Sequence, residues 1–373
     1  MMMACRAYSQ QPWQNASLPF VTRVHNLISL LNMSEKVLLL EVSTPALPRI
    51  GLPSFSHKEC ERGDSDGTAF PSGAAMAATW DPELIETVAR SIALEARSFS
   101  NLGHSDTVCY GPVVNFIHDA RWGRTNEMLG GEDTTLGAVL GSAFVRGMQS
   151  WRAPTRAGEE YFAALSIVKH LNVYSGPEGD GFTFGPRALR FSFNVNLPST
   201  RAEREFFLPI FHATAIAGAS GFMCSYSAVS GALNQSNVPA CASRELLTNV
   251  IREEWGWNGL VLSDAGAVAF IGNVSIGGVP FGHHFTSSDE ESAIAAITAG
   301  MDLELTCCGA PQVFPTLPGA VAAGRLAESV LDTALARSLS TRFKLGKLDD
   351  PALLPFSTWG NRLRCFNSQR KLQ

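Results

Sequence analysis

The segment 221–264 constrains the fold of this chain most, because it predicts a strand, a helix and a second strand in close succession. Phe222–Tyr226 is expected to form the first strand, Ser243–Trp255 the helix and Gly259–Ser263 the second strand. Asp264 follows where the second strand ends. In a parallel barrel the carboxyl ends of the strands carry the catalytic side chains. The segment therefore predicts a carboxylate, near the tyrosine that ends the first strand, at a site suited to a hydroxyl-rich ligand.

The rest of the chain alternates helices and strands in the same way. The helix after Asp81 is the clearest, because Asp81 can cap it and Pro82 suits its first turn. This alternation predicts a mainly parallel α/β architecture. The other expected helices cover residues 22–31, 136–151, 202–219, 289–299 and 326–345, and the other expected strands cover 108–117, 161–169 and 301–305.

Composition removes several classes of function. The 373 residues carry a net charge of −5, so no basic field favours nucleic acid as a partner. No apolar run approaches the roughly 20 residues needed to cross a bilayer. The eight cysteines form no CxxC pair with metal-site spacing, which disfavours zinc. Cys224 and Cys241 flank one loop and could form a disulfide or remain free thiols, and the sequence leaves both open.

Four short motifs occur in order around Asp264, and together they resemble one enzyme family. They are Cys224–Ser227 (CSYS), Pro239–Ala242 (PACA), Glu254–Trp257 (EWGW) and Ser263–Asp264. This set is similar to the nucleophile region of glycoside hydrolase family 3, in particular its β-xylosidase and α-L-arabinofuranosidase group. The resemblance implies a TIM-type (β/α)8 barrel, complete or slightly irregular, over residues 18–351, with 352–373 as a short tail.

The resemblance also implies a reaction. Family members release terminal β-linked xylose, glucose or arabinofuranose from oligosaccharides or aryl glycosides, with retention and without a cofactor. Retaining glycosidases use a carboxylate nucleophile and a second carboxyl group about 5–5.5 Å away. Asp264 stands at the nucleophile position.

Several residues match the family's sugar-binding positions. Lys169-His170 ends the strand ALSIVKH, and Arg124 closes DARWGR, where Ala120 replaces a proline. Tyr226 belongs to CSYS, and Glu59 is the expected acceptor for an equatorial hydroxyl.

The chain departs from the family around these positions. Gly130-Gly131 contains one glycine more than the family pattern, and Arg62-Gly63 stands in place of a His-Gly pair. Ser56 and His57 replace two tryptophans, which removes aromatic surface for sugar stacking.

The general acid is not nominated by any motif. In two-domain family members it comes from a second domain, which we do not expect within the residues that follow position 351. Acidic residues that could lie near the pocket are Asp119, Glu127, Glu132, Asp302 and Glu304. Two rival interpretations follow: a non-catalytic remnant or sugar-binding domain, and a Schiff-base aldolase that uses Lys169.

Location and metal binding rest on weaker signals. The first residues show no apolar region of the kind found in signal peptides. Family members from eukaryotes are mostly secreted, and the chain contains four N-x-S/T sequons, so we expect an exported protein. His283-His284 could suggest a metal, but a solvated loop is the favoured interpretation, and no metal site is expected. The sequons lie at Asn15, Asn32, Asn234 and Asn273.

Overall fold

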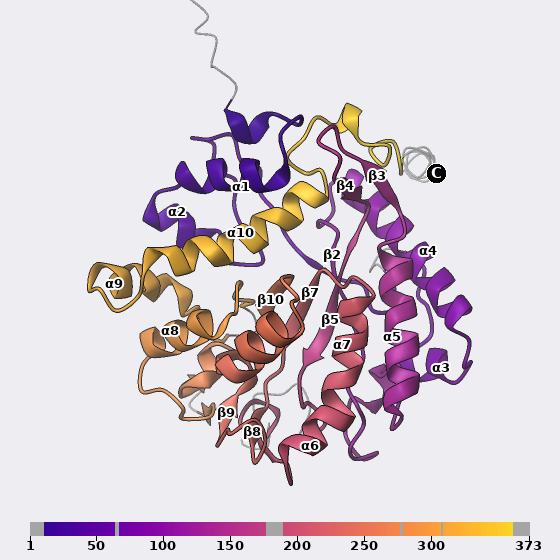
Figure 1. The fold of residues 1–373 in the computed structure, drawn as a ribbon, viewed down its shortest axis with the longest axis vertical. Helices are drawn as coiled ribbons and strands as arrows, with labels where there is room; N and C mark the ends of the chain where they lie inside the picture. Colours follow the sequence, from indigo (N-terminus) through magenta and orange to yellow (C-terminus); the bar gives the residue numbers. More distant parts are fainter. Residues whose placement is uncertain (1–10, 64–66, 177–188, 277–278, 307–308, 361–373) are drawn as a thin grey trace, which may run out of the picture.

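A five-stranded parallel sheet stands at the centre of the computed structural model, which describes residues 11–63, 67–176, 189–276, 279–306 and 309–360 (Figure 1). Its strands lie in the order β1-β2-β5-β7-β10, and every neighbouring pair is parallel. Their bounds are Lys58–Glu59, Val108–Val113, Leu165–Leu171, Gly221–Cys224 and Leu260–Ser263.

Single backbone bridges continue this arrangement beyond the regular strands. Leu303 pairs in parallel with Leu262 of β10, and Glu304 pairs in parallel with Glu41. Thr44 then pairs with Phe55, shortly before β1 begins. The pairings therefore run from β1 through β10 and back to the segment that precedes β1.

One buried apolar cluster fills the space that these segments surround. Side chains two residues apart on a strand point to the same face, and the cluster takes such alternate residues from β2, β5 and β10. Its members are Val42, Phe55, Val108, Tyr110, Leu165, Ile167, Met223, Leu260, Leu262, Leu303 and Leu345. The prediction of an α/β fold of the barrel type is confirmed, and its irregularity lies in the segments that pair only through single bridges.

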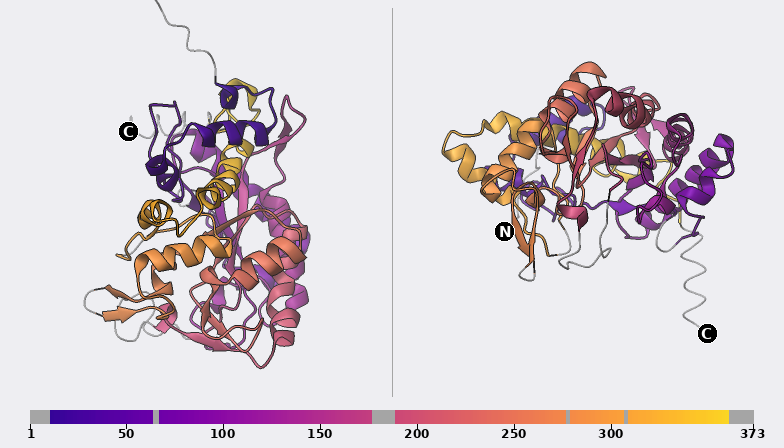
Figure 2. Two further views of the ribbon diagram at one scale, coloured as in Figure 1. Left: turned by 60° about the vertical axis from the view of Figure 1, so that its left-hand side comes forward. Right: turned by 90° about the horizontal axis from the view of Figure 1, so that it is seen from below.

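The helices cover the outside of the strands, as the two views of Figure 2 show. Helices α4, α5 and α7 pack in succession along one side, while α10 lies beside α1 although the two are at opposite ends of the chain (Figure 1). The helices are α1 Phe20–Ser29, α2 Met33–Leu38, α3 Gly73–Ala77, α4 Pro82–Asn101, α5 Thr134–Met148, α6 Thr200–Ala202, α7 Leu208–Ile216, α8 Asp289–Ala299, α9 Leu317–Ala322 and α10 Glu328–Lys344.

Local sequence signals account for most helices. The Asp81 carboxylate accepts hydrogen bonds from the N–H groups of Glu83 and Leu84, so it caps α4 as expected. The helix expected at 202–219 instead begins with a π-helical turn, Glu203–Phe207, before α7. Pro209 in the first turn of α7 lacks an N–H and cannot donate to a carbonyl of that turn, which favours the wider form. The helix expected at 243–255 is likewise π-helical over Glu245–Glu254.

Three expected strands differ from those observed. The strand expected at 161–169 is split: Glu160–Phe162 pairs with Arg152–Pro154 as an antiparallel hairpin, and β5 begins only at Leu165. Within this hairpin the Tyr161 hydroxyl donates to the Asp349 carboxylate at 2.7 Å. The strand expected at 108–117 ends at Val113, and the strand expected at 301–305 is reduced to its bridges.

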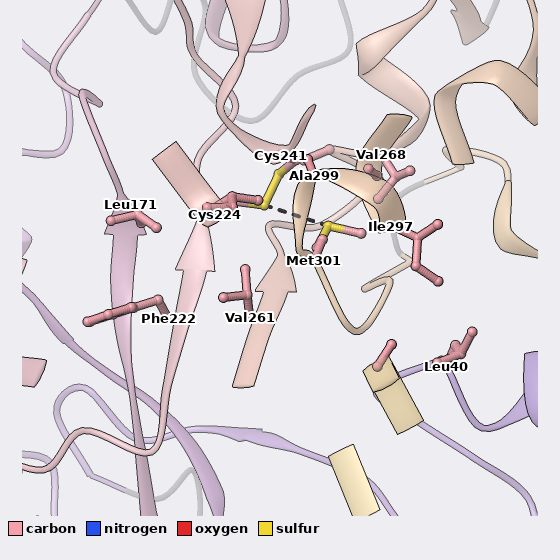
Figure 3. Close-up of a cluster of buried hydrophobic side chains, with 14 of the residues drawn as sticks. Leu40, Leu171, Phe222, Cys224, Cys241, Val261, Val268, Ile297, Ala299 and Met301 are labelled. Carbon is pink, nitrogen blue, oxygen red and sulfur yellow. Dashed lines mark hydrogen bonds between the residues drawn. A yellow bond between two sulfur atoms is a disulfide. The ribbon is translucent and has the colours of Figure 1, made fainter. Parts of the chain in front are cut away.

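Two disulfides link the sheet to its surroundings. Cys224 of β7 is bonded to Cys241, and Figure 3 shows the pair in the apolar core, where the Cys224 sulfur lies 3.8 Å from that of Met301. The sequence left open whether Cys224 and Cys241 are bonded or free, and in the structure they form a disulfide. A second disulfide joins Cys60 to Cys109. The remaining cysteines, at positions 5, 307, 308 and 365, lie outside the described residues.

Residues 351–360 pack back against the domain. Phe356 is buried, and the Trp359 ring lies 5.2 Å from the Trp151 ring in an edge-to-face contact. No helix in the described part of the chain is both long and apolar enough to cross a membrane.

A buried pair of carboxyl groups lies outside the cavity described below. Glu304 accepts hydrogen bonds from the N–H groups of Val313 and Phe314, and Glu41 lies beside it, 8% exposed. Burial and the negative charge of Glu304 raise the pKa of Glu41 to about 9. Glu41 therefore keeps its proton in the folded protein at neutral pH.

This proton predicts a pH dependence of folding. In the unfolded chain Glu41 ionises near 4.5, whereas in the folded protein it stays protonated to about 9, so its contribution to stability falls as pH rises between these values. Replacing Glu41 by Gln should remove that fall. We expect the free energy of unfolding, measured with urea at about pH 5 and about pH 8.5, to change less in E41Q than in the parent by a few kcal/mol. Exposed Glu132→Gln is the control, and an unchanged pH dependence in E41Q would contradict the assignment.

Candidate active site

A cavity of about 1090 Å³ opens where the carboxyl ends of the strands meet. Five of the strand segments contribute to its wall or to the loops directly after them. All six residues predicted from the sequence lie on that wall: Glu59, Arg124, Lys169, His170, Tyr226 and Asp264. Side chains that are far apart in the sequence therefore face one space.

The backbone holds Asp264 in place. Its N–H donates to the Cys224 carbonyl at 3.0 Å, and its Oδ1 accepts from the Ala265 N–H at 2.7 Å. The residue is 8% exposed, and its Oδ2 has no hydrogen-bond partner among the described residues. One carboxylate oxygen is thus held by the backbone, while the other is buried beside His170 on the wall of the cavity.

Lys169 carries a positive charge in the cavity that also contains the nucleophile candidate. Its Nζ donates to both carboxylate oxygens of Glu59, at 2.6 and 2.8 Å, and lies 3.5 Å from a Glu61 oxygen. Burial alone would lower the pKa of Lys169, but the two carboxylates outweigh it and raise the pKa. A Schiff-base lysine needs a neutral amine at working pH. The environment of Lys169 therefore disfavours the aldolase interpretation.

His170 is neutral, and its surroundings define the tautomer. Burial, followed by the charges of Arg124, Lys169 and Arg190, lowers the pKa of His170 well below its usual value. Its Nε2 lies 3.2 Å from Arg124 Nη2, which can only donate, so Nε2 must be the acceptor. The proton then sits on Nδ1, which faces Asn115 Oδ1 at 3.3 Å. Since Nε2 and Asp264 Oδ2, 3.7 Å apart, are both acceptors, they are not hydrogen-bonded to each other.

Arg124 is held from two sides. Its guanidinium makes a two-pronged pair with Glu127, at 2.8 and 2.6 Å, and lies 5.5 Å from the centre of the Tyr174 ring. Although burial opposes it, Glu127 raises the pKa of Arg124, so the charge is permanent. The ion pair that could have explained this residue structurally is present, and the same side chain also lines the cavity.

Tyr226 is fixed through its hydroxyl and its backbone. The hydroxyl donates to the Ala265 carbonyl at 2.9 Å, and burial, followed by the Asp264 charge, raises the pKa of the phenol. His283 Nε2 lies 2.7 Å from the Tyr226 carbonyl and donates to it. The interpretation of His283-His284 as a solvated loop is wrong for His283, which is buried, while His284 is exposed.

The sequence did not predict several charged residues of the cavity, among them Arg190 and Glu61. Arg190 is 3% exposed, and its guanidinium carbon lies 5.2 Å from the Tyr226 ring centre. No motif in the sequence distinguished it from other arginines. Glu61 faces the cavity two residues after Glu59, and the two-residue period of a strand could have identified it.

Most of the carboxyl groups considered as proton donors lie elsewhere. Of those five, Glu127 alone lines the cavity. Asp302 is buried between two arginines, and Glu304 binds backbone N–H groups. Asp119 pairs with its exposed neighbour Arg121, and Glu132 is exposed. Within the described ranges, no group of three or more His, Cys, Asp or Glu side chains has a metal-binding arrangement.

The family model for the glycosyl hydrolase family 3 N-terminal domain matches residues 22–341. The chain belongs to this family. An exo-1,4-β-xylosidase of Emericella nidulans is 33% identical over 372 residues, covering 94% of this chain and 44% of the relative. β-D-xylosidase 1 of Arabidopsis thaliana is 31% identical over 371 residues, covering 96% of this chain and 44% of the relative. The chain thus spans less than half the length of these relatives.

The fold of a solved relative agrees with this membership. A family 3 exo-β-xylosidase in complex with a xylobiose aziridine activity-based probe matches with a TM-score of 0.79 and 24% identity. The match covers 93% of this chain and 43% of that structure. At this level of identity the likeness establishes the fold alone.

The state of His170 can be measured directly. Because its pKa is lowered, we expect the ¹⁵N signals of its ring to show Nδ1 protonated and Nε2 unprotonated, unchanged between about pH 5.5 and pH 8. Replacing Arg124 by Met removes one of the cations responsible and should bring the titration nearer to the usual value. The exposed ring of His25 provides the reference signal. A His170 midpoint near 6.5 in the parent protein would contradict this account.

Proposed function

We propose that this chain carries the nucleophile and the sugar-binding groups of a retaining exo-glycosidase that releases terminal β-linked xylose, or the related glucose or arabinofuranose. The observation that carries the proposal is the Asp264 carboxylate on the wall of the cavity, which it shares with Lys169 and His170. The names of the fungal and plant relatives support xylose as the first choice of sugar.

The proposed reaction begins with attack by the Asp264 carboxylate on the anomeric carbon. A bond forms between them, and the glycosidic oxygen leaves with the electron pair of the bond that breaks. Water then cleaves the glycosyl ester and restores the carboxylate, so two inversions give net retention. The ammonium of Lys169 donates to sugar hydroxyl oxygens, and the Glu59 carboxylate accepts from sugar hydroxyl groups.

Leaving-group chemistry follows from the ion pairs in the cavity. Glu59 and Glu61 are paired with Lys169, and Glu127 is paired with Arg124. A carboxylate whose oxygens already accept from a cation is not free to carry a proton to a leaving oxygen. We infer that this chain by itself acts on activated aryl glycosides, whose leaving groups need no proton, in preference to natural disaccharides.

The same ion pairs favour a second candidate, a sugar-binding domain without turnover. It would use the same cavity and the same hydroxyl contacts, but the Asp264 ester would not form. The two candidates differ in one property, the covalent bond to Asp264.

We further propose that the protein is exported. All four sequon asparagines, Asn15, Asn32, Asn234 and Asn273, are exposed and so accessible to glycosylation. The two disulfides favour an oxidising compartment.

A trapped intermediate tests the proposal. A 2-deoxy-2-fluoro-β-xyloside with a dinitrophenyl leaving group forms the glycosyl ester without an acid, and the fluorine slows its hydrolysis. We expect the intact mass to rise by one fluoroxylosyl group and peptide mapping to place it on Asp264. Asp264→Asn should lower the labelling rate at least about 1000-fold.

The control is the fold of the variant, checked by circular dichroism. A folded parent protein that stays unlabelled but binds D-xylose saturably, as measured by calorimetry, would favour the sugar-binding domain. A label on any residue other than Asp264 would refute the assignment of the nucleophile.

A further inference from the structure

The Cys60–Cys109 disulfide lies directly behind the sugar-binding carboxylates. Both cysteines are fully buried, and they belong to an apolar cluster with Ala93 of α4 and Phe144 of α5. The disulfide therefore lies on the helix side of the sheet, away from the cavity.

Strand β1 has few other attachments to the sheet. It contains only Lys58 and Glu59, and it is the edge strand of the five. It pairs with β2 over two residue pairs, and the Cys60 N–H adds a hydrogen bond to the Tyr110 carbonyl at 3.1 Å. Just before the two strands, Ser56 and Asp106 exchange two further hydrogen bonds, each of 3.1 Å. So short an edge strand has little hydrogen-bonded ladder to fix its position.

The residues on either side of Cys60 face the cavity. Successive side chains of an extended segment alternate between its two faces. Cys60 points to the helices, whereas Glu59 and Glu61 point into the cavity and contact Lys169, at 2.6 and 3.5 Å. A covalent bond from Cys60 to β2 therefore fixes the place of both carboxylates at once.

Lys169 depends on this arrangement. Its side chain is 5% exposed, and Glu59 and Glu61 are the carboxylates within ion-pair distance of it in the described part of the chain. The Glu59 side chain, in contrast, is 59% exposed on the cavity wall. If β1 moved, the exposed carboxylate could turn into solvent while the buried ammonium could not.

We propose that the Cys60–Cys109 disulfide positions the sugar-binding subsite, and that its reduction weakens glycoside binding while leaving the nucleophile competent. The reductant is a dithiol such as dithiothreitol. Each cysteine sulfur gains one electron and one proton, and the dithiol is oxidised to its cyclic disulfide. This inference rests on the proposed function, because it concerns the same cavity.

The nucleophile is anchored independently of β1. Asp264 follows β10, and its N–H donates to the Cys224 carbonyl at the end of β7. In the sheet order, β2, β5 and β7 separate β1 from β10. A loosened β1 should therefore change the binding of the sugar and not the attack by Asp264.

The test compares the kinetics of labelling by the fluoroxyloside in the parent protein and in a Cys60→Ala/Cys109→Ala variant. We expect the concentration for half-maximal labelling to rise roughly tenfold, and the maximal rate to stay within about twofold. Dithiothreitol should have the same effect on the parent protein. Any effect of the reagent on the double variant reports the Cys224–Cys241 disulfide and is subtracted. An unchanged half-maximal concentration, or a fall in the maximal rate alone, would overturn the proposal.

Glu59→Gln separates positioning from general stability. If the disulfide acts through the carboxylate, a protein with Glu59→Gln should show no further rise in the half-maximal concentration when the disulfide is reduced. Full additivity of the two changes would overturn the proposal. If the cysteine variant does not fold, the same comparison is made by reducing the disulfide with dithiothreitol in the parent protein and in the Glu59→Gln protein.

The proposed function and this inference fail in different ways. If the oxidised parent protein is not labelled, the glycosidase proposal fails, and the comparison is made with D-xylose by calorimetry. A weaker affinity after reduction then still supports positioning, whereas an unchanged affinity or no binding at all overturns it. If the parent protein is labelled and reduction has no effect, the positioning role alone fails.

Discussion

The buried ammonium of Lys169 is the group on which the arrangement of the cavity depends. An unpaired charge in the interior is costly, and Lys169 is tolerated because Glu59 and Glu61 pair with it. Glu59 lies in the two-residue edge strand β1 and Glu61 follows it, so β1 must keep its position beside β2. The Cys60–Cys109 disulfide fixes that position.

The charges around Lys169 also define the states of the other groups. Together with burial, the cations keep His170 neutral, which leaves its Nε2 as an acceptor for Arg124. Glu127 fixes the plane of the Arg124 guanidinium, so its N–H groups can donate to a sugar in one orientation. Asp264 is held by backbone N–H and carbonyl groups on the wall of a cavity whose other charged groups are positioned in advance.

The sequence predicted the cavity residues that follow regular strands and motifs, and it failed where tertiary contacts decide. Asp264 and Lys169 could be placed because each follows an apolar strand, and parallel strands end at one edge. Arg190 follows no such pattern, and its role in the cavity arises from packing on Tyr226. The strand expected at 301–305 alternates apolar and acidic residues in the sequence, yet Glu304 accepts from backbone N–H groups of 313–314 and only single bridges form. Periodicity cannot distinguish these outcomes.

If Asp264 forms a covalent ester during turnover, the sugar is released with the anomeric configuration of the substrate. Proton NMR of the anomeric signals during hydrolysis of dinitrophenyl β-xyloside would identify the first sugar released. We expect β-xylose first, followed by slow mutarotation, because two displacements at one carbon retain configuration. α-Xylose as the first product would mean direct attack by water, and it would contradict the assignment of Asp264 as nucleophile.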